Sequence, residues 1–440
     1  MKLKPIYTFL ILCAMAYASA CRKDYTDPSS VNESQAYSSA IGLTGTLLGA
    51  QETYSSNQTS AIYNKVAING LSTFELILLN QGNVGEFQLS TGGNNVDATN
   101  SDLNTLWQTD NKVIYVTSKI IAATPDVVND PAYASGLVAY ATILKALAMG
   151  DLSEFWNQVP SGTGTAVTFI DRLQGYKNAI AQINSALALI QANPVSQKFT
   201  LSLPFTASAS PQGIDIEGTL NALKARYSLF IGDYATALSA ANAVDLSKAS
   251  TFNYAPVNPN PIYITVTATN NIFQPVDSTL GLPAGLAPNA ADQRVPFYTS
   301  INSKMAPRFR INGFGNSVTN PYPLYLPGEM SLIKAEAYIR QASPDLASAL
   351  AQLNVVVTKK ASSDPLGVGA NLPPIAGPLT AAQLLDQIYR NRCIELFMSG
   401  LKLEDARRFG RPLTEIKRNF FPYPFSERDN NRNTPADPAF

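Results

Sequence analysis

The chain has 440 residues, of which 15% are charged, and its 32 basic and 32 acidic residues give a net charge of zero. We therefore expect no basic surface for nucleic acid and no polybasic membrane patch. Histidine is absent, which excludes Ser-His and Cys-His nucleophile pairs and most zinc sites. Because phosphate-binding glycine loops and metal-ligand clusters are also absent, we expect neither a metal nor a cofactor.

The N-terminus has the order of an export signal. Two lysines precede an apolar run at residues 6–17, and the small residues Ala-Ser-Ala lead directly into Cys21. This triplet with its cysteine resembles the lipobox of bacterial lipoproteins, although an alanine stands first where leucine is usual. We expect a signal peptide at residues 1–20, acylation of Cys21 and a tether at residues 21–32, with a plain secretory signal as the alternative. Two or three acyl chains on Cys21 would anchor the protein stably.

Apolar spacing predicts that residues 33–218 form a mainly helical N-terminal half. The expected helices run from Asn32 or Ser34 to about Tyr54, and over residues 60–80, 103–123, 137–149 and 173–192. Residues 80–102 are polar and glycine-rich, which predicts a long loop, and residues 199–216 look irregular.

The C-terminal half, about residues 219–440, combines helical hairpins with an irregular insert. Gly232-Asp233-Tyr234 predicts the tight turn of a tetratricopeptide-like hairpin between two alanine-rich helices. A second helix-turn-helix is expected at residues 329–357. Between these hairpins, residues 249–323 are rich in proline, asparagine and aromatics, so that only short β-stretches such as residues 262–266 are expected.

Several separated motifs resemble the SusD/RagB family of outer-membrane nutrient-uptake lipoproteins. They are residues 21–27 (CRKDYTD), the turn at residues 232–234 (GDY), residues 327–337 (PGEMSLIKAEA) and residues 388–424. The last segment contains Arg392 with Glu395-Leu396, then EDARRFG at 404–410 and FPYP at 421–424, in the family's order. The chain departs from the family pattern at Ser399, where glutamate is usual, and at Phe409, where tryptophan is common.

The resemblance implies an all-α fold of tetratricopeptide-like hairpins with long loops and little β-structure, in a single domain over residues 33–440. It also implies a lipoprotein at the outer face of the outer membrane. Such a protein would bind an extracellular oligosaccharide without catalysis and deliver it to a SusC-like TonB-dependent transporter.

Ligand contacts are expected on the two irregular segments, because binding residues concentrate on loops that a rigid scaffold holds. Aromatic rings can stack on sugar faces while amides bond to hydroxyls, whereas Trp107 and Trp156 lie in or beside helices and are expected in the core. The candidate ligand-binding residues are Phe87, Asn94, Asn95, Tyr263, Phe273, Tyr298, Phe309 and Tyr322.

Three alternatives remain open. The same fold could bind peptides, or the protein could be a periplasmic scaffold. A surface enzyme is the third, because the carboxylate pairs Asp151 with Glu154 and Glu404 with Asp405 could hydrolyse glycosides. The charges of residues 390–408 alternate in sign on helical faces, which favours structural ion pairs over catalysis.

Overall fold

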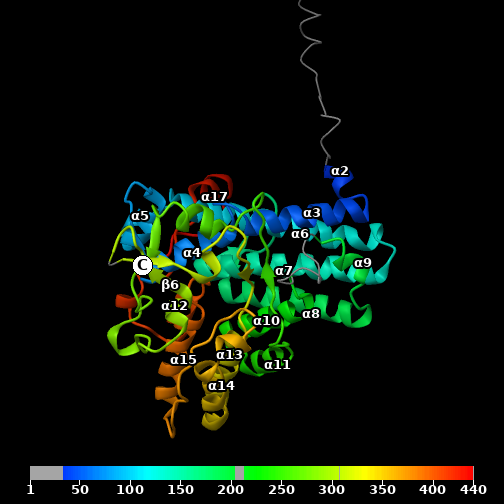
Figure 1. Cartoon of the computed structure of the whole chain (residues 1–440). Helices are drawn as coiled ribbons and strands as arrows, with labels where there is room; N and C mark the ends of the chain where they lie inside the picture. The colour runs from blue at the N-terminus through cyan, green and yellow to red at the C-terminus, as the bar shows by residue number, and fades with distance from the viewer. Residues whose placement is uncertain (1–32, 204–212, 307, 440) are drawn as a thin grey trace, which may run out of the picture.

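The structure, a computed structural model, describes residues 33–203, 213–306 and 308–439. The chain is mainly helical, with short strands and loops between the helices (Figure 1). The prediction of an all-α fold of helical hairpins is confirmed. The expected signal peptide, Cys21 and the tether lie outside the described residues.

The helices of the N-terminal half pack side by side in chain order, α6 against α7 and α7 against α8 (Figure 1). These helices are α2 (Glu33–Ala36), α3 (Ala40–Ser55), α4 (Ala61–Ser72), α5 (Val84–Thr91), α6 (Ser101–Val127), α7 (Pro131–Phe155), α8 (Arg172–Ala192) and α9 (Gln197–Thr200).

The predicted first helix is broken into α2 and α3, so its expected start at Asn32 or Ser34 is wrong for the main helix. Ser39 is the N-cap of α3, and its hydroxyl accepts a hydrogen bond from the Gly42 amide at 3.1 Å. A Cβ at Gly42 would lie 2.7 Å from the Ala36 carbonyl oxygen, so the close approach of the two helices requires glycine.

Helix α7 is the central helix of this half. Asp130 caps it by accepting bonds from the amides of Ala132 and Tyr133, and Pro131 occupies its first turn. Among the described residues it is the one helix long and apolar enough to cross a membrane, but 72% of its most apolar window is buried. It is therefore the core helix of this fold.

Both predicted helical hairpins are present in the C-terminal half, as α10 with α11 and α13 with α14. Asp233 caps α11 by accepting a bond from the Thr236 amide at 3.1 Å, and Gly232 has a φ of +79° that makes the turn possible. The helices of this half are α10 (Ile216–Phe230), α11 (Tyr234–Asn242), α12 (Arg294–Tyr298), α13 (Pro327–Arg340), α14 (Leu346–Thr358), α15 (Ala381–Glu395), α16 (Lys402–Arg408) and α17 (Phe425–Asn430).

The strands form two-stranded antiparallel sheets that pair as β1–β5, β2–β3, β4–β8 and β6–β7. They are β1 (Leu76–Leu78), β2 (Gln158–Pro160), β3 (Phe169–Asp171), β4 (Thr251–Phe252), β5 (Phe273–Pro275), β6 (Thr299–Ile301), β7 (Phe309–Ile311) and β8 (Tyr322–Pro323). Short 3₁₀ and π turns complete the fold: η1 (Gly93–Asn95), η2 (Tyr263–Thr267), η3 (Ala284–Leu286), η4 (Gly313–Gly315), η5 (Ala361–Ser363) and η6 (Leu413–Glu415).

Three local predictions are wrong. The helix expected at residues 60–80 ends at Ser72, because Phe74 takes a φ of +64° and residues 76–78 then enter β1. The expected loop at 80–102 contains α5 and η1. The β-stretch considered at residues 262–266 is instead the π-helical turn η2.

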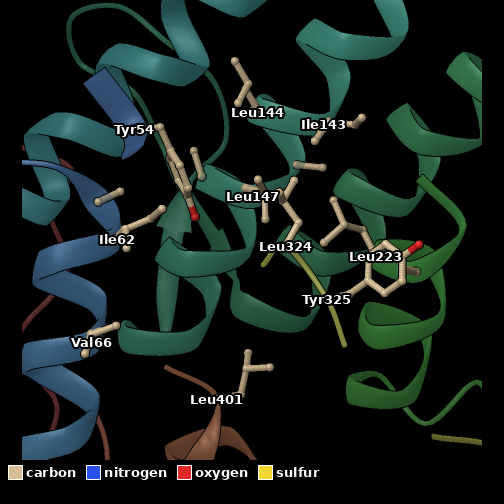
Figure 2. Close-up of a cluster of buried hydrophobic side chains, with 14 of the residues drawn as sticks. Tyr54, Ile62, Val66, Ile143, Leu144, Leu147, Leu223, Leu324, Tyr325 and Leu401 are labelled. Atoms are coloured by element: carbon tan, nitrogen blue, oxygen red, sulfur yellow. The ribbon is translucent and has the colours of Figure 1, made fainter. Parts of the chain in front are cut away.

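The core is continuous across both halves. Figure 2 shows side chains from the first helices, such as Tyr54 and Ile62, meeting Leu147 of α7 and Leu324 from the C-terminal half. Trp107 and Trp156 are 3% and 0% exposed, as predicted, and their rings meet edge to face at 4.9 Å.

Buried ion pairs join the C-terminal helices, as the alternating charges predicted. Asp405 receives Arg392 Nε at 2.9 Å and Arg408 Nη2 at 2.8 Å, and Arg408 also pairs with Glu336 at 2.7 Å. All four side chains are at most 8% exposed, so the charges neutralise one another within the fold.

Candidate ligand-binding surface

A short sheet joins the two segments on which ligand contacts were predicted. Strand β1 pairs with β5, with Ile77 opposite Gln274. Directly beyond β1, the Asn80 amide donates to the Asn271 side-chain oxygen at 3.2 Å. The two predicted segments, almost 200 residues apart in sequence, are therefore joined side by side at this sheet.

Gln274 is the buried centre of this region. Its side-chain oxygen accepts a bond from the Ile311 amide at 2.8 Å, and its side-chain nitrogen donates to the Val266 carbonyl at 3.4 Å. Arg310 donates to the Thr267 carbonyl at 2.7 Å. These bonds fix β7 and η2 on β5.

We call the surface formed by α5, β1, β5, η2, β6 and β7 the loop surface. Figure 1 shows α5 and β6 at the same side of the molecule, with α9 at the opposite side. Each of these elements packs on a neighbour in the group: α5 on β1, β1 on β5, and β5 on both η2 and β7.

The loop surface presents aromatic and aliphatic side chains. Phe87 on α5 is 39% exposed, Ile264 on η2 is 43% exposed and Ile301 on β6 is 59% exposed. Tyr263 and Phe309 are half-buried. A ring such as Phe87 can pack against the C–H face of a sugar, and amides such as Asn80 and Asn271 can bond to its hydroxyls.

Sequence reasoning missed Asn80, Asn271, Ile264 and Ile301. The only signal for the two asparagines was the general abundance of amide side chains, and the elements that hold Ile264 and Ile301, η2 and β6, are too short to show periodicity.

Asn94 and Asn95 are exposed on η1, at the other end of α5. The Gly93 amide donates to the Lys417 carbonyl at 3.0 Å, which holds this turn on the C-terminal segment. A Cβ at Gly92, where φ is +75°, would lie 2.4 Å from Lys417 Cβ, so the junction of α5 with η1 requires glycine.

Two of the predicted ligand-binding rings are buried, and for these the prediction is wrong. Phe273 is 0% exposed and stacks on Tyr63 at 6.0 Å. Tyr298 is 3% exposed, packs edge to face on Phe297 at 4.9 Å and donates to the Glu395 carbonyl at 2.5 Å. Irregular backbone does not imply exposure here, because these apolar rings anchor the insert to the core.

Tyr322 is half-buried. Its hydroxyl donates to the Met398 carbonyl at 2.7 Å, and its ring lines a small pocket of about 60 Å³ together with Tyr54 and Lys65. Of the eight candidates, Phe87, Tyr263 and Phe309 lie on the loop surface, and Asn94 and Asn95 lie on the adjoining turn.

A cation lies over an exposed ring beside this region. Lys417 Nζ is 4.5 Å from the ring centroid of Phe74, which is 39% exposed and precedes β1. Burial lowers the pKa of Lys417 to about 8. This ammonium group therefore begins to lose its charge just above neutral pH.

The carboxylate pairs considered for glycoside hydrolysis are buried. Asp151 and Glu154 are each 1% exposed; Asp151 pairs with Lys65 at 2.6 Å and accepts a bond from the Tyr54 hydroxyl at 2.6 Å. Burial raises the pKa of Glu154 to about 8, against the attraction of Lys65. These groups hold helices together instead of lining an open cleft.

The second pair has the same character. Glu404 is 1% exposed and receives Arg172 and Arg407, each at 2.8 Å. Asp405 is held by arginines as described above. Within the described ranges, no group of three or more Cys, Asp or Glu side chains could hold a metal ion.

Helical hairpins that carry an irregular loop surface are typical of helical scaffold proteins. Comparison with solved structures shows which fold within this class the chain has. No family model matches the sequence, and no curated protein matches it significantly. The chain has the SusD-like fold, with matches over nearly its full length to many SusD superfamily structures.

Three of these structures illustrate the similarity. A SusD superfamily protein from Bacteroides thetaiotaomicron superposes with a TM-score of 0.70 at 16% identity, covering 91% of this chain and 100% of that one. A SusD-like carbohydrate binding protein from Bacteroides fragilis gives 0.65 at 16% identity, covering 85% and 87%. A laminarin binding SusD-like protein gives 0.67 at 14% identity, covering 93% and 100%.

Proposed function

We propose that this protein is a lipid-anchored outer-membrane protein that captures an extracellular glycan on its loop surface and passes it to a TonB-dependent transporter. The observation that carries the proposal is the SusD-like fold over nearly the whole chain, shared with proteins described as carbohydrate binding and laminarin binding. The loop surface supports it, because it carries the exposed ring of Phe87 and exposed amide side chains such as Asn80 and Asn271.

The mechanism is binding without bond cleavage. An anchored protein that holds its ligand beside a transporter raises the local ligand concentration there, so that delivery becomes an intramolecular step. The acids that could have served catalysis are buried in ion pairs with Lys65, Arg172 and Arg407, which fits a carrier better than a hydrolase.

The test is an affinity screen of the mature chain, residues 21–440, against neutral glycans and short peptides. For a glycan that binds, Phe87→Ala and Phe309→Ala should each weaken binding by about tenfold or more, which corresponds to ~1.4 kcal/mol. Tyr115→Ala is the matched control, because Tyr115 is 41% exposed but lies on α6, outside the loop surface.

Glycan affinity that is unchanged in both loop-surface variants would contradict this location of the site. Binding of peptides in place of glycans would keep the fold's carrier role and replace the ligand. Consumption of the glycan by the pure protein would overturn the proposal as a whole.

A further inference from the structure

A second cleft lies away from the loop surface, between α6, α7, α8 and the β2–β3 hairpin. Its volume is about 270 Å³, near the lower end of the roughly 300–1,000 Å³ range typical of small-molecule sites. Its polar lining includes Asn111, Ser118, Lys145, Thr163, Asn178 and Gln182.

The lining has a regular origin in the helices. Asn178 and Gln182 are one turn apart on α8, and Lys145 and Met149 are one turn apart on α7, so each helix turns one face to the cleft. Met149 and Leu152 supply an apolar wall beside these polar groups. Amides next to an apolar wall suit a ligand that has both hydroxyls and C–H surface.

Lys145 is the unusual member of this lining. It is half-buried, and its Nζ donates to Gln182 Oε1 at 3.4 Å. No carboxylate of the described residues forms an ion pair with it, and burial lowers its pKa without any compensating charge. By contrast, Lys65 and Lys359, whose side chains are 11% and 10% exposed, each have a carboxylate oxygen at 2.6 Å.

Burial makes the ammonium group of Lys145 less well hydrated than a surface lysine, so an anion that reaches it is attracted more strongly. The cleft is open to solvent at the hairpin, where residues 161–163 are exposed, so the anion can come from outside. The amides around the lysine also retain bonding capacity: Asn178 accepts a bond from Gln174 at 2.9 Å through its oxygen, which leaves its amino group for a ligand.

We propose that this cleft binds one acidic sugar unit, with the sugar carboxylate at Lys145 and its hydroxyls at Asn178, Gln182 and Asn111. The volume fits a single monosaccharide rather than an oligosaccharide, and the apolar wall formed by Met149 and Leu152 lies beside the C–H face of the ring. The site is separate from the loop surface, so it stands whether or not a neutral glycan binds there.

Calorimetric titration of the mature chain with glucuronate and galacturonate, against glucose and galactose, tests the proposal directly. The acidic sugars should bind at least tenfold more tightly than the neutral ones, and Lys145→Met should remove this preference. Lys334→Met is the matched control, because Lys334 is also half-buried with a pKa lowered by burial but lies on α13, outside the cleft. It should bind acidic sugars as the wild type does.

Gln182→Glu provides a second variant that does not depend on tolerance of the lysine substitution. It places a carboxylate where an oxygen now lies 3.4 Å from Lys145 Nζ, so the lysine gains an internal partner. The variant should melt at a higher temperature than the wild type, and its affinity for acidic sugars should fall at least tenfold.

Equal affinity for acidic and neutral sugars, or wild-type affinity in both folded cleft variants, would overturn the proposal. So would binding of a short peptide through its carboxylate when the acidic sugars fail to bind.

Discussion

Lys65 organises the most buried polar cluster of the N-terminal half. Its Nζ is 2.6 Å from Asp151 and 4.0 Å from Glu154, so a single cation serves two carboxyl groups. Tyr54 donates to the same Asp151, and Asn69 donates to Glu154 at 3.0 Å. The cluster ties α3 and α4 to α7, because Tyr54 comes from α3, Lys65 and Asn69 from α4, and both carboxyl groups from α7.

Removing one charge of this cluster should destabilise the fold. Asp151→Ala leaves Lys65 buried without its close partner, and breaking a buried pair costs about 3–5 kcal/mol. Urea unfolding at neutral pH measures the loss. Asp245→Ala is the control: Asp245 and Lys248 are both 53% exposed and 3.8 Å apart, and among the described residues the carboxylate otherwise bonds only to the neighbouring Ser247, so the loss should stay within about 1 kcal/mol.

The opposite outcome would revive the enzyme alternative. If Asp151→Ala kept wild-type stability but abolished turnover of a glycan, the carboxylate pair would be catalytic and its ion pair with Lys65 incidental.

Glu154 should make stability depend on pH. Its pKa in the fold is about 8, raised from the ordinary 4.5 mainly by burial, so the folded state retains a proton that the unfolded chain releases. The corresponding stability is present below pH 4.5 and is lost as the pH rises through 8. Glu154→Gln, an uncharged isostere, should therefore gain on the wild type by at most ~1.4 kcal/mol per pH unit across this window.

Urea unfolding of both proteins at pH 5, 6, 7 and 8 measures this difference. Glu52→Gln, at an exposed position of α3, is the control and should follow the wild-type profile. Parallel profiles for Glu154→Gln and the wild type would show that Glu154 is ionised in the fold throughout.

At the scale of single residues, helical periodicity predicted which side chains of the helices are buried. The burial of Trp107 and Trp156 followed from their positions in or beside amphipathic helices. The burial of Phe273 and Tyr298 could not be predicted, because it depends on long-range packing against Tyr63 and the C-terminal end of α15. A segment without periodicity offers no sign of which ring faces inward.

At the scale of elements, caps decide where the hairpins turn. Asp233 accepts a bond from the Thr236 amide, so Asp233→Ala should destabilise the protein by about 1 kcal/mol, within the ~0.5–2 kcal/mol range for lost N-caps. The midpoint of urea unfolding measures it. Asp215→Ala is the matched control, since Asp215 holds the N-cap position of α10 without a side-chain cap bond.

A smaller loss is expected for Asp215→Ala than for Asp233→Ala. Equal losses would mean that the Asp233 bond contributes nothing beyond the general effect of removing a carboxylate at a helix N-terminus.

The hairpins were predictable as elements because glycine, aspartate and alanine spacing encode the turn locally. The sheet of β1 and β5 was not, because its partners Ile77 and Gln274 are almost 200 residues apart and each strand has three residues. The loop surface depends on that pairing, so its composition could be guessed from the sequence but its assembly could not. Helix α5 was missed because residues 80–102 contain several glycines, which lower helix propensity.

At the scale of the whole molecule, the helical body and the N-terminal cysteine give the protein two separate parts. One large core crosses both halves, and a smaller second cluster packs between α13, α14 and α15. Helix α2, the first described element, projects from one edge of the body (Figure 1). The proposed carrier function needs this body to stay at the membrane, and the only proposed means is acylation of Cys21. The anchor can therefore be tested without disturbing the fold.

Cys21→Ser should abolish incorporation of labelled palmitate and release the protein from the outer-membrane fraction, because a stable anchor needs two or three acyl chains on that sulfur. The released protein should keep its melting temperature and its glycan affinity in solution, since Cys21 precedes the first described helix, α2. Cys393→Ser is the control: this thiol is buried, so the variant should stay membrane-bound.

Protease treatment of intact cells should digest the wild-type protein if it faces the exterior. A wild-type protein that resists protease on intact cells and remains in the membrane fraction would place the anchor at the inner leaflet, where delivery to a transporter from outside could not occur.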